Sequence, residues 1–360
     1  METKVFFMQQ PLYIFINQSI KRLLFFCVLL TVKQLTAQQK PGYTQYILNN
    51  YIINPAITGI ENYTDVKLSY RNQWTGIDGA PVTTYLSIQG PVGKKDYRTS
   101  ATSYDVPGEN PRGRSYMESY NAAEPHHGLG GIIVSDKTGY LNRWGGYVTY
   151  AYHKGVSART TLSAGFMAGI TAVSLDASKI QWGSLNANDP AIGYNSGEIS
   201  KIKPEIGAGL WLYSAEYFVG VSVLNIVPAK ANFVKDDIYG GNFVPHFFTT
   251  AGYKFLLNED ISLLPSVMLQ FINPYPMQVY TNAKLQYQDK VWIGSGYRFG
   301  DQLGGFTAMA GLNVSNTFNV GYSYDVSTSK LVNYSRNTHE IIIGFLLGNK
   351  YGDTCPRNVW

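Results

Sequence analysis

The chain has 360 residues, of which 45% are apolar, 14% aromatic and only 15% charged, with 36 glycines and 28 tyrosines. Soluble domains usually carry about 25% charged residues, so this composition argues against an ordinary soluble protein and favours aromatic-rich strands joined by turns. The formal net charge is +5, which by itself would leave nucleic acid among the possible partners.

The first 37 residues have the features of a secretory signal. Lys21 and Arg22 precede ten apolar residues, LLFFCVLLTV at 23–32, and a short polar stretch then leads to Ala37. Ten apolar residues are too few to span a bilayer, which takes about 20. We therefore predict a signal peptide, residues 1–37, that is cleaved after Ala37; a retained N-terminal anchor helix is the alternative.

Removal of this leader changes the charge and the cysteine count. The leader holds four basic residues and one acidic residue, which leaves 25 basic against 23 acidic residues, a net charge of +2. This near neutrality argues against nucleic acid as a partner. Of the two cysteines only Cys355 remains, so the mature chain by itself can form no disulfide and depends on strand pairing and packing.

The mature sequence alternates apolar and polar residues with a period of two. In DVKLSYRNQW at 65–74, apolar side chains fall on one face and charged or polar side chains on the other. The same alternation recurs in 161–172, 278–287 and 318–325. Strands of about 8 to 12 residues with one apolar and one wet face have the length and pattern of tilted transmembrane β-strands.

Fourteen such strands are predicted, an even number, as single-chain bacterial barrels require. They are 65–74, 81–90, 127–135, 143–154, 160–174, 203–213, 217–224, 246–256, 260–269, 278–287, 290–299, 303–312, 317–325 and 338–347. From the fourth strand on, short connections alternate with mostly longer ones, as periplasmic turns alternate with outer loops. The sequence therefore predicts an all-β fold, a transmembrane outer-membrane β-barrel of about 14 antiparallel strands (65–347) with both termini periplasmic. A secreted β-sandwich or β-solenoid is the soluble alternative.

Three segments fall outside the predicted barrel wall. Residues 38–64 precede it, residues 94–126 form an insertion between the second and third strands on the predicted periplasmic side, and residues 348–360 form a periplasmic tail. A strand miscounted early in the chain is the alternative to the insertion.

The first of these segments contains QYILNNYIINPAITG at 45–59. Pro55 lacks an N–H and biases Asn54 toward an extended backbone, which stops a strand or helix there. The apolar residues before it need cover, and the barrel's inner mouth or lumen is the nearest cover. We predict a docking plug, with a disordered leader as the alternative. Its apolar residues are Tyr46, Ile47, Leu48, Tyr51, Ile52 and Ile53.

The sequence offers no catalytic or cofactor site. The five histidines have no metal-ligand spacing, and no G-x-S-x-G elbow supports a membrane phospholipase. Gly-x-Gly pairs in the predicted strands lack the helix that phosphate binding needs, and we expect them to let neighbouring lumen residues pack closely. Lys67, Lys284 and Arg298 are predicted to be lumen charges. No catalytic, metal-binding or cofactor-binding residue is assigned.

Several separated motifs carry a family resemblance. INPAITG at 53–59 and YRNQWTGIDGAPVTTYLSIQGPVG at 70–93 resemble the opening signature of the PorP/SprF family of type IX secretion system membrane proteins. The last strands of that family are similar to WIGSGYRFGDQLGGFTAMAGLNV, GYSYDVSTSKL and THEIIIGF at 292–314, 321–331 and 338–345. The residues singled out in the opening signature are Asn54, Pro55, Ala56, Gly59, Arg71, Gln73, Trp74, Gly79, Ala80 and Pro81. The long 94–126 segment departs from the family pattern.

The resemblance implies an outer-membrane component of the Bacteroidota type IX secretion and gliding machinery, and no enzyme. Some members work with periplasmic or outer-membrane secretion components, whereas others are partners of one secreted adhesin-like protein and recognise its C-terminal domain. We expect the second role, with the lipid bilayer as surroundings. The residues leave open a transporter of small hydrophobic molecules with an N-terminal plug, and a lipid hydrolase with a Ser–His pair at the outer rim.

Overall fold

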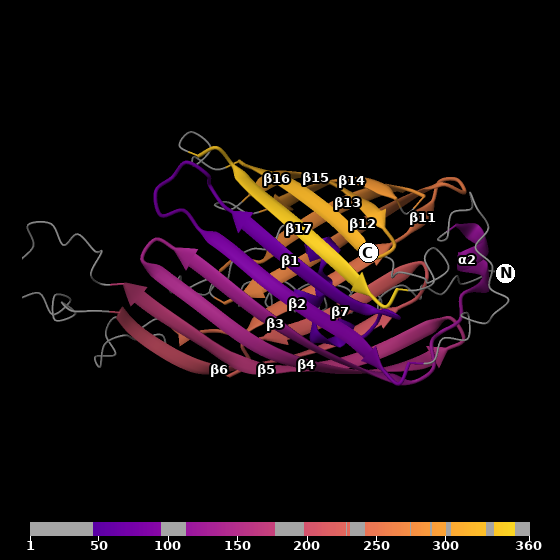
Figure 1. The fold of residues 1–360 in the computed structure, drawn as a ribbon, viewed down its shortest axis with the longest axis horizontal. Coiled ribbons are helices and arrows are strands. Elements are labelled where there is room, and N and C mark those ends of the chain that lie inside the picture. The colour runs from indigo at the N-terminus through magenta and orange to yellow at the C-terminus, as the bar shows by residue number, and fades with distance from the viewer. Residues whose placement is uncertain are drawn as a thin grey trace, which may run out of the picture.

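The computed structural model describes residues 46–94, 113–176, 198–227, 229–230, 242–273, 275–288, 290–299, 304–328 and 335–349. These residues form a closed antiparallel β-barrel (Figure 1). Its fourteen wall strands are β1 (Thr64–Asn72), β2 (Val82–Val92), β3 (His126–Thr138), β4 (Leu141–Ser157), β5 (Thr160–Asp176), β6 (Glu198–Tyr213), β7 (Tyr217–Leu224), β10 (His246–Tyr253), β12 (Ile261–Ile272), β13 (Gln278–Tyr287), β14 (Val291–Phe299), β15 (Gly305–Ser315), β16 (Phe318–Ser327) and β17 (Thr338–Leu347).

The remaining elements are short. Strand β11 (Phe255–Leu256) pairs with β12, and β8 (Ala229–Lys230) pairs with β9 (Asn242–Phe243) in a separate two-stranded sheet. The helices are η1 (Tyr46–Leu48), η2 (Asn50–Ile52), η3 (Pro55–Ile57) and α2 (Arg114–Ser119). No helix among the described residues is long and apolar enough to cross a membrane.

Pairing of the first and last strands closes the barrel. Thr64 on β1 lies opposite Leu347 on β17, and Asn72 lies opposite His339. The start of β1 and the end of β17 therefore lie at the same end of the barrel, which we call the terminal end. The other end, where β1 turns into β2, we call the loop end.

The fourteen-strand prediction is confirmed, and β7, β13 and β17 have the predicted bounds. Four strands are longer than their predicted ranges: β3 has 13 residues, β6 has 16, and β4 and β5 have 17 each. β6 starts at Glu198 rather than residue 203, and it pairs with β5 as far as Asp176. A ladder is held by backbone hydrogen bonds, which polar side chains do not prevent, so polar residues do not mark its end.

One predicted strand is divided. Residues 246–256 form β10 and β11, separated by Lys254. The backbone N–H of Lys254 donates to the carbonyl of Glu216 at 2.6 Å, in the turn between β6 and β7. This bond is the next step of the β7–β10 register, and β11 keeps the register of β10 with β12, so the break at Lys254 is local.

The period-two pattern separates an apolar outer face from a polar inner face. On β1, Leu68 and Tyr70 are 43% and 49% exposed, whereas Ser69 and Arg71 are almost fully buried. Aromatic side chains are exposed near strand ends, among them Tyr297 at the loop end. An apolar outer wall with aromatic residues toward its rims is the surface that a bilayer covers.

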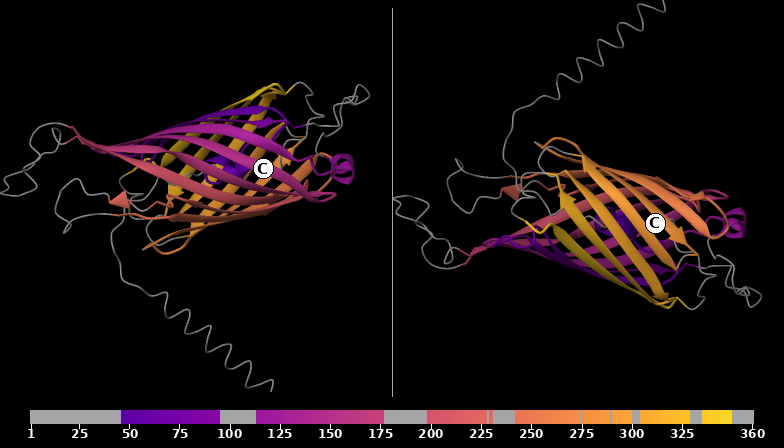
Figure 2. Two further views of the ribbon diagram at one scale, coloured as in Figure 1. Left: turned by 90° about the horizontal axis from the view of Figure 1, so that it is seen from below. Right: turned by 90° about the horizontal axis from the view of Figure 1, so that it is seen from above.

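The interior is filled by the chain itself. The segment from Tyr46 to Tyr63, which we call the inner segment, lies within the barrel (Figure 2). Its apolar residues from Tyr46 to Ile60 form one cluster with inward side chains from strands around the wall, including Tyr85, Trp211 and Tyr280, whereas Tyr63 packs with Leu346. Among the described residues, the larger apolar core therefore lies inside the barrel.

The connection between β2 and β3 lies at the terminal end. Its described part includes α2, where the Arg114 guanidinium forms an ion pair with Glu259 at 3.1 Å, and the Arg159 side chain donates to the carbonyl of Met117. Residues 95–112 of the predicted insertion are outside the described residues. So are the predicted signal peptide, residues 38–45 and most of the predicted tail.

Candidate functional site

Asn54 anchors the inner segment to the wall. It caps η3 with an extended backbone (φ −139°, ψ 109°), as expected of a residue before Pro55. Its side-chain oxygen accepts from the N–H of Ala56 at 3.0 Å. Its Nδ2 donates to the carbonyls of Leu210 and Val221, at 3.1 and 3.3 Å, which are register partners on β6 and β7. One side chain thus joins three parts of the chain.

Glycines let the inner segment lie directly on the strands. A Cβ on Gly165 of β5 would overlap the backbone of Pro55 and Ala56, and one on Gly209 of β6 would overlap the amide of Asn54. Gly59, with φ +77°, packs in the same way on the backbone of β3. The expectation that strand glycines permit close packing in the lumen holds at Gly209, and the packing partner is the inner segment.

Serine side chains satisfy the carbonyls of the inner segment. Ser222 on β7 donates to the carbonyl of Ile53 at 2.6 Å, and Ser163 on β5 donates to that of Ala56 at 2.5 Å. These carbonyls lie in three-residue 3₁₀ turns or beside them, where the helix cannot pair them itself. A buried carbonyl without a partner would cost about 1 to 3 kcal/mol, so each serine removes a penalty of that order.

A histidine pair holds the next part of the segment. The Nε2 of His153 on β4 bonds to the carbonyl of Thr58 at 2.8 Å, and its Nδ1 bonds to the hydroxyl of Tyr213 at 3.1 Å. His126 on β3 stacks on His153, with ring centroids 4.5 Å apart and planes 3° apart. Both imidazoles are buried, so the stack forms part of the wall against which the segment lies.

Polar contacts also fix both flanks of the segment. The hydroxyl of Tyr51 lies 2.6 Å from Thr149 Oγ1 on β4, and the N–H of Gly59 donates to Gln89 on β2 at 2.8 Å. Burial raises the pKa of the Tyr51 hydroxyl above its ordinary value. Desolvation likewise raises the pKa of Tyr46 to about 12. Both hydroxyls therefore stay protonated well beyond neutral pH.

Two cavities lie on opposite sides of the inner segment. The cavity toward the loop end is lined by Tyr46, Ile52 and Ile53 of the segment, and we call it the apolar cavity. The cavity toward the terminal end is lined by Leu48 and Glu61 of the segment, among other residues. The described part of the lumen is thus interrupted near its middle by the chain itself.

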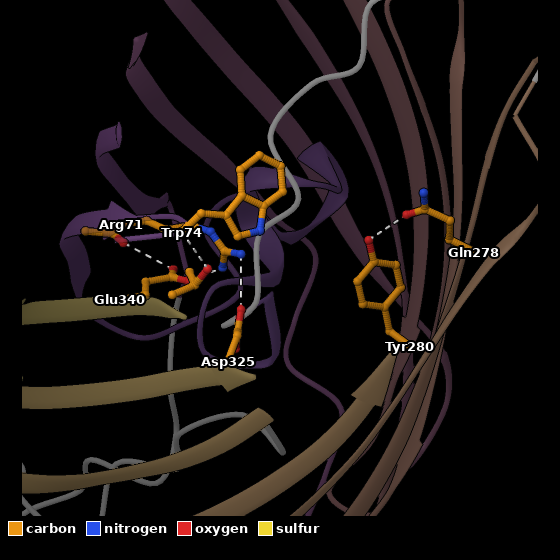
Figure 3. Close-up of polar contacts among 8 residues, drawn as sticks. Arg71, Trp74, Gln278, Tyr280, Asp325 and Glu340 are labelled. Carbon is orange, nitrogen blue, oxygen red and sulfur yellow. Dashed lines mark hydrogen bonds and ion pairs between the residues drawn. The ribbon is translucent and has the colours of Figure 1, made fainter. Parts of the chain in front are cut away.

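Arg71 forms an ion-pair cluster on the opposite part of the wall (Figure 3). Its guanidinium donates to Glu340 at 2.8 Å and to Asp325 at 3.1 Å, and Ser69 donates to Glu340 at 3.2 Å. The closing register places Arg71 directly opposite Glu340. All three charged side chains are at most 5% exposed, so the cluster joins β1, β16 and β17 inside the barrel.

The other signature residues form the ordered β1–β2 loop. Trp74 adopts φ 49° and its N–H donates to Thr338 at 3.2 Å, beside the Arg71 cluster (Figure 3). The N–H of Gln73 donates to the carbonyl of Pro81 at 2.9 Å, and Ala80 donates to Ile77 within the loop. Gly79 accepts from the next hairpin, as described below. These residues shape the loop end.

Two of the three predicted lumen charges line one cavity, and the third lies apart from them. Lys67 pairs with Asp65 at 2.7 Å, and it lines the cavity toward the terminal end together with Lys284. Lys284 also lies 5.9 Å from the ring of Trp292. Arg298 lies nearer the loop end, 5.8 Å from the centre of the Tyr280 ring. The structure therefore brings two of the three together.

Sequence reasoning missed the wall residues that hold the inner segment. A signal was present, because consecutive inward positions on β5 and β7 are small: Ser163 and Gly165, then Gly220 and Ser222. Small inward residues on neighbouring strands indicate that another piece of backbone comes close. His153 gave no such signal, since nothing near it in sequence marks it.

Within the described ranges, no group of three or more His, Cys, Asp or Glu side chains could hold a metal ion. Four of the histidines bond to tyrosine hydroxyls or carbonyls; on the exposed outer wall, His127 bonds to Tyr150 and His339 bonds to Tyr322, each at 2.7 Å.

The closed fourteen-stranded antiparallel wall with an apolar outer face defines the class, an outer-membrane β-barrel. Comparison with family models narrows it. The model described as type IX secretion system membrane protein PorP/SprF matches residues 35–345, and the chain belongs to this family. It is a membrane component of type IX secretion, located in the outer membrane.

No curated protein matches the chain significantly. Solved barrels resemble it only distantly. The outer membrane protein Omp33 of Acinetobacter baumannii has 8% identity and a TM-score of 0.43, over 81% of this chain and 100% of that one. The toluene transporter TbuX of Ralstonia pickettii has 10% identity and a TM-score of 0.45, over 82% and 92%. The monoaromatic hydrocarbon channel CymD has 12% identity and a TM-score of 0.44, over 86% and 93%.

Proposed function

We propose that this barrel is a non-enzymatic partner or surface anchor of a secreted, adhesin-like type IX substrate, which it recognises through the substrate's C-terminal domain. Family membership supports the secretion context. The single observation that carries the proposal is the inner segment, because a lumen interrupted by hydrogen-bonded chain suits recognition at the barrel ends better than passage through it.

The loop end offers a surface for such recognition. The β1–β2 loop is tied to both neighbours: Thr75 donates to the carbonyl of Asn337 at 2.8 Å, and Gly139 donates to that of Gly79 at 2.8 Å. A loop fixed on two sides loses little conformational entropy when a partner binds, which favours affinity. Docked loops or an added strand of the partner would supply the contacts.

The terminal end, which we place in the periplasm, would contact secretion components on that side. The connection between β2 and β3 supports this role, since α2 lies there with Arg114 and Glu259 both 66% exposed. Two ends with different partners suit a protein that holds a surface protein to the machine that exported it.

Affinity purification in mild detergent tests the proposal. We expect an adhesin-like chain and secretion components to be enriched over an unrelated barrel of the same expression level. Asp78→Arg in the exposed β1–β2 loop should lose the adhesin and keep the periplasmic components, whereas Arg114→Glu at the terminal end should do the reverse. Equal recovery from the unrelated barrel would contradict the proposal.

A transporter of small hydrophobic molecules is the second candidate. The cavities on both sides of the inner segment support it, on the condition that the segment moves and joins them into one path. Liposomes with the wild-type barrel and with an Asn54→Ala variant should then differ in uptake of a hydrophobic tracer. Uptake no greater than that of protein-free liposomes for both would exclude transport and leave the anchor role.

A further inference from the structure

A histidine on the outer wall lies beside two tyrosines at the terminal end. His127 on β3 is the register partner of Tyr152 on β4, and their ring centroids are 5.1 Å apart. Its Nδ1 lies 2.7 Å from the hydroxyl of Tyr150, whose ring centroid is 5.8 Å away. When Tyr150 donates to Nδ1, the imidazole carries its hydrogen on Nε2. His127 therefore presents a donor at Nε2 that has no hydrogen-bond partner among the described residues.

The outward side chains of β4 change in character toward the terminal end. They are Val148, which is 68% exposed, then Tyr150 and Tyr152, and then Lys154, which is also exposed. Outward residues are two apart, so each step advances about 7 Å along the strand. The order of apolar residue, aromatic hydroxyl and cation matches the order of hydrocarbon, interface and headgroups in one leaflet of a bilayer. Lys154 therefore lies at the level of the lipid headgroups.

Lys154 and His127 are diagonal neighbours on this face. Tyr152 lies opposite His127, and Lys154 is the next outward residue on β4, so long side chains at the two positions reach the same space. Among the described residues, Lys154 has no carboxylate at ion-pair distance. The outward residues in register with these positions on β2 and β5 are uncharged: Val92, Leu162 and Ala164. Two donors, one of them a cation, thus face the headgroup layer together.

The same arrangement at the loop end lacks the cation. His339 on β17 is the register partner of Tyr324 on β16, and its Nδ1 lies 2.7 Å from the hydroxyl of Tyr322. The next outward position on β16, which corresponds to Lys154, is Val326. The chain therefore contains a matched site that has the histidine and both tyrosines but not the charge.

We propose that Lys154 and His127 bind the phosphate of an anionic phospholipid in the leaflet at the terminal end. Nζ of Lys154 and Nε2 of His127 would donate to the phosphate oxygens. The acyl chains would lie on Leu129 and Phe166, which flank Tyr150 in register and are 55% and 47% exposed. The site needs neither an adhesin nor a path through the lumen, so it stands apart from the proposed function.

Native mass spectrometry of the whole barrel in mild detergent tests this inference. The probe is dioleoylphosphatidylglycerol, and the comparison is dioleoylphosphatidylcholine, whose headgroup brings its own cation to compete with Lys154. Lys154→Gln should weaken binding of the first phosphatidylglycerol about fivefold and leave that of phosphatidylcholine unchanged, since one basic residue near a membrane surface contributes about that factor for an anionic lipid. His127→Gln should also weaken phosphatidylglycerol binding, whereas His339→Gln, the matched control, should not.

The matched site gives the second measurement. Val326→Lys supplies the missing cation at the loop end and should add a second tightly bound phosphatidylglycerol. In imidazole ¹³C NMR of the wild type, this lipid should shift the His127 resonance saturably and leave that of His339 in place. An unchanged unfolding temperature shows that each variant is folded.

Two results overturn the proposal. The first is phosphatidylglycerol binding that is equal in the wild type and Lys154→Gln, and the second is a His127 resonance that the lipid does not shift. Displacement of the lipid by an equal concentration of inorganic phosphate would overturn the lipid assignment, because the site would then bind free phosphate as well as it binds a headgroup.

Discussion

Replacing Asn54 by Ala should loosen the inner segment without opening the barrel wall. The substitution removes three hydrogen bonds of a side chain that is 2% exposed: one from Ala56 and two to the carbonyls of Leu210 and Val221. A typical intramolecular hydrogen bond contributes about 0.5 to 1.5 kcal/mol net. The carbonyls of Leu210 and Val221 belong to the β6–β7 pair, so each is counted only for its bond to Asn54. Loss of the three bonds should reduce the free energy that holds the docked segment by about 2 to 4 kcal/mol.

Amide hydrogen exchange measures this loss. Ile57, Thr58 and Ile60 donate backbone hydrogen bonds within the segment, so their amides exchange when it opens locally. A loss of about 2 to 4 kcal/mol corresponds to exchange that is roughly 30- to 700-fold faster, because each 1.4 kcal/mol is tenfold. Amides of the wall strands should exchange at their wild-type rates.

Two further variants serve as comparisons for Asn54→Ala. Asn49→Ala removes one bond, to Ser87 at 3.1 Å, and should accelerate exchange only about fivefold, for about 1 kcal/mol. Asn54→Asp keeps the acceptor for Ala56 but places a carboxylate against two carbonyls, so it should loosen the segment at least as much as Asn54→Ala. The reasoning is refuted if Asn54→Ala exchanges like the wild type, or no faster than Asn49→Ala.

Three further outcomes are expected. Gly165→Ala should displace the backbone of the inner segment and speed proteolysis of that segment at least tenfold. Gly131→Ala is the control, because its new methyl would lie 3.5 Å from the nearest atom and should leave proteolysis unchanged. Equal rates for the two variants would contradict the close packing. Arg71→Gln leaves two lumen carboxylates without their cation and should cost about 3 to 5 kcal/mol in thermal unfolding followed by circular dichroism, with partial recovery on adding Glu340→Gln. The pKa of Tyr46 rises from 10 in the unfolded chain to about 12, and that of Tyr51 is also raised. Docking should therefore be constant below pH 10 and lose at least about 2 to 3 kcal/mol between pH 10 and 12. Tyrosine absorbance and proteolysis should follow this change, and release at pH 8 would contradict it.

The wall strands could be predicted because each has one face toward lipid and one face toward the lumen. An outward side chain must suit lipid and an inward one must suit the lumen, so the sequence repeats a period of two through fourteen strands. The ends of β5 and β6 could not be predicted from that pattern. Asp176 pairs with Glu198 there, and charged residues in a ladder beyond the bilayer look the same as charged residues in a loop.

The lumen contacts were harder to predict because they join distant residues. Arg71 and Glu340 are 269 positions apart, and only the β1–β17 register makes them neighbours. Once closure is assumed, a strand-by-strand register would have found this pair. Asn54 is different: its partners on β6 and β7 depend on where the inner segment lies, which no strand register determines.

A barrel of fourteen strands encloses more space than its own inward side chains fill, since about eight strands already give an interior that side chains just fill. Here the extra space holds a segment whose polar groups bond to β2, β4, β5, β6 and β7, while Arg71 joins the remaining side of the wall. Because these bonds are spread over many strands, a partner that displaced the segment would have to replace all of them at once. Recognition at either end leaves them intact, so it requires far less free energy than entry into the lumen.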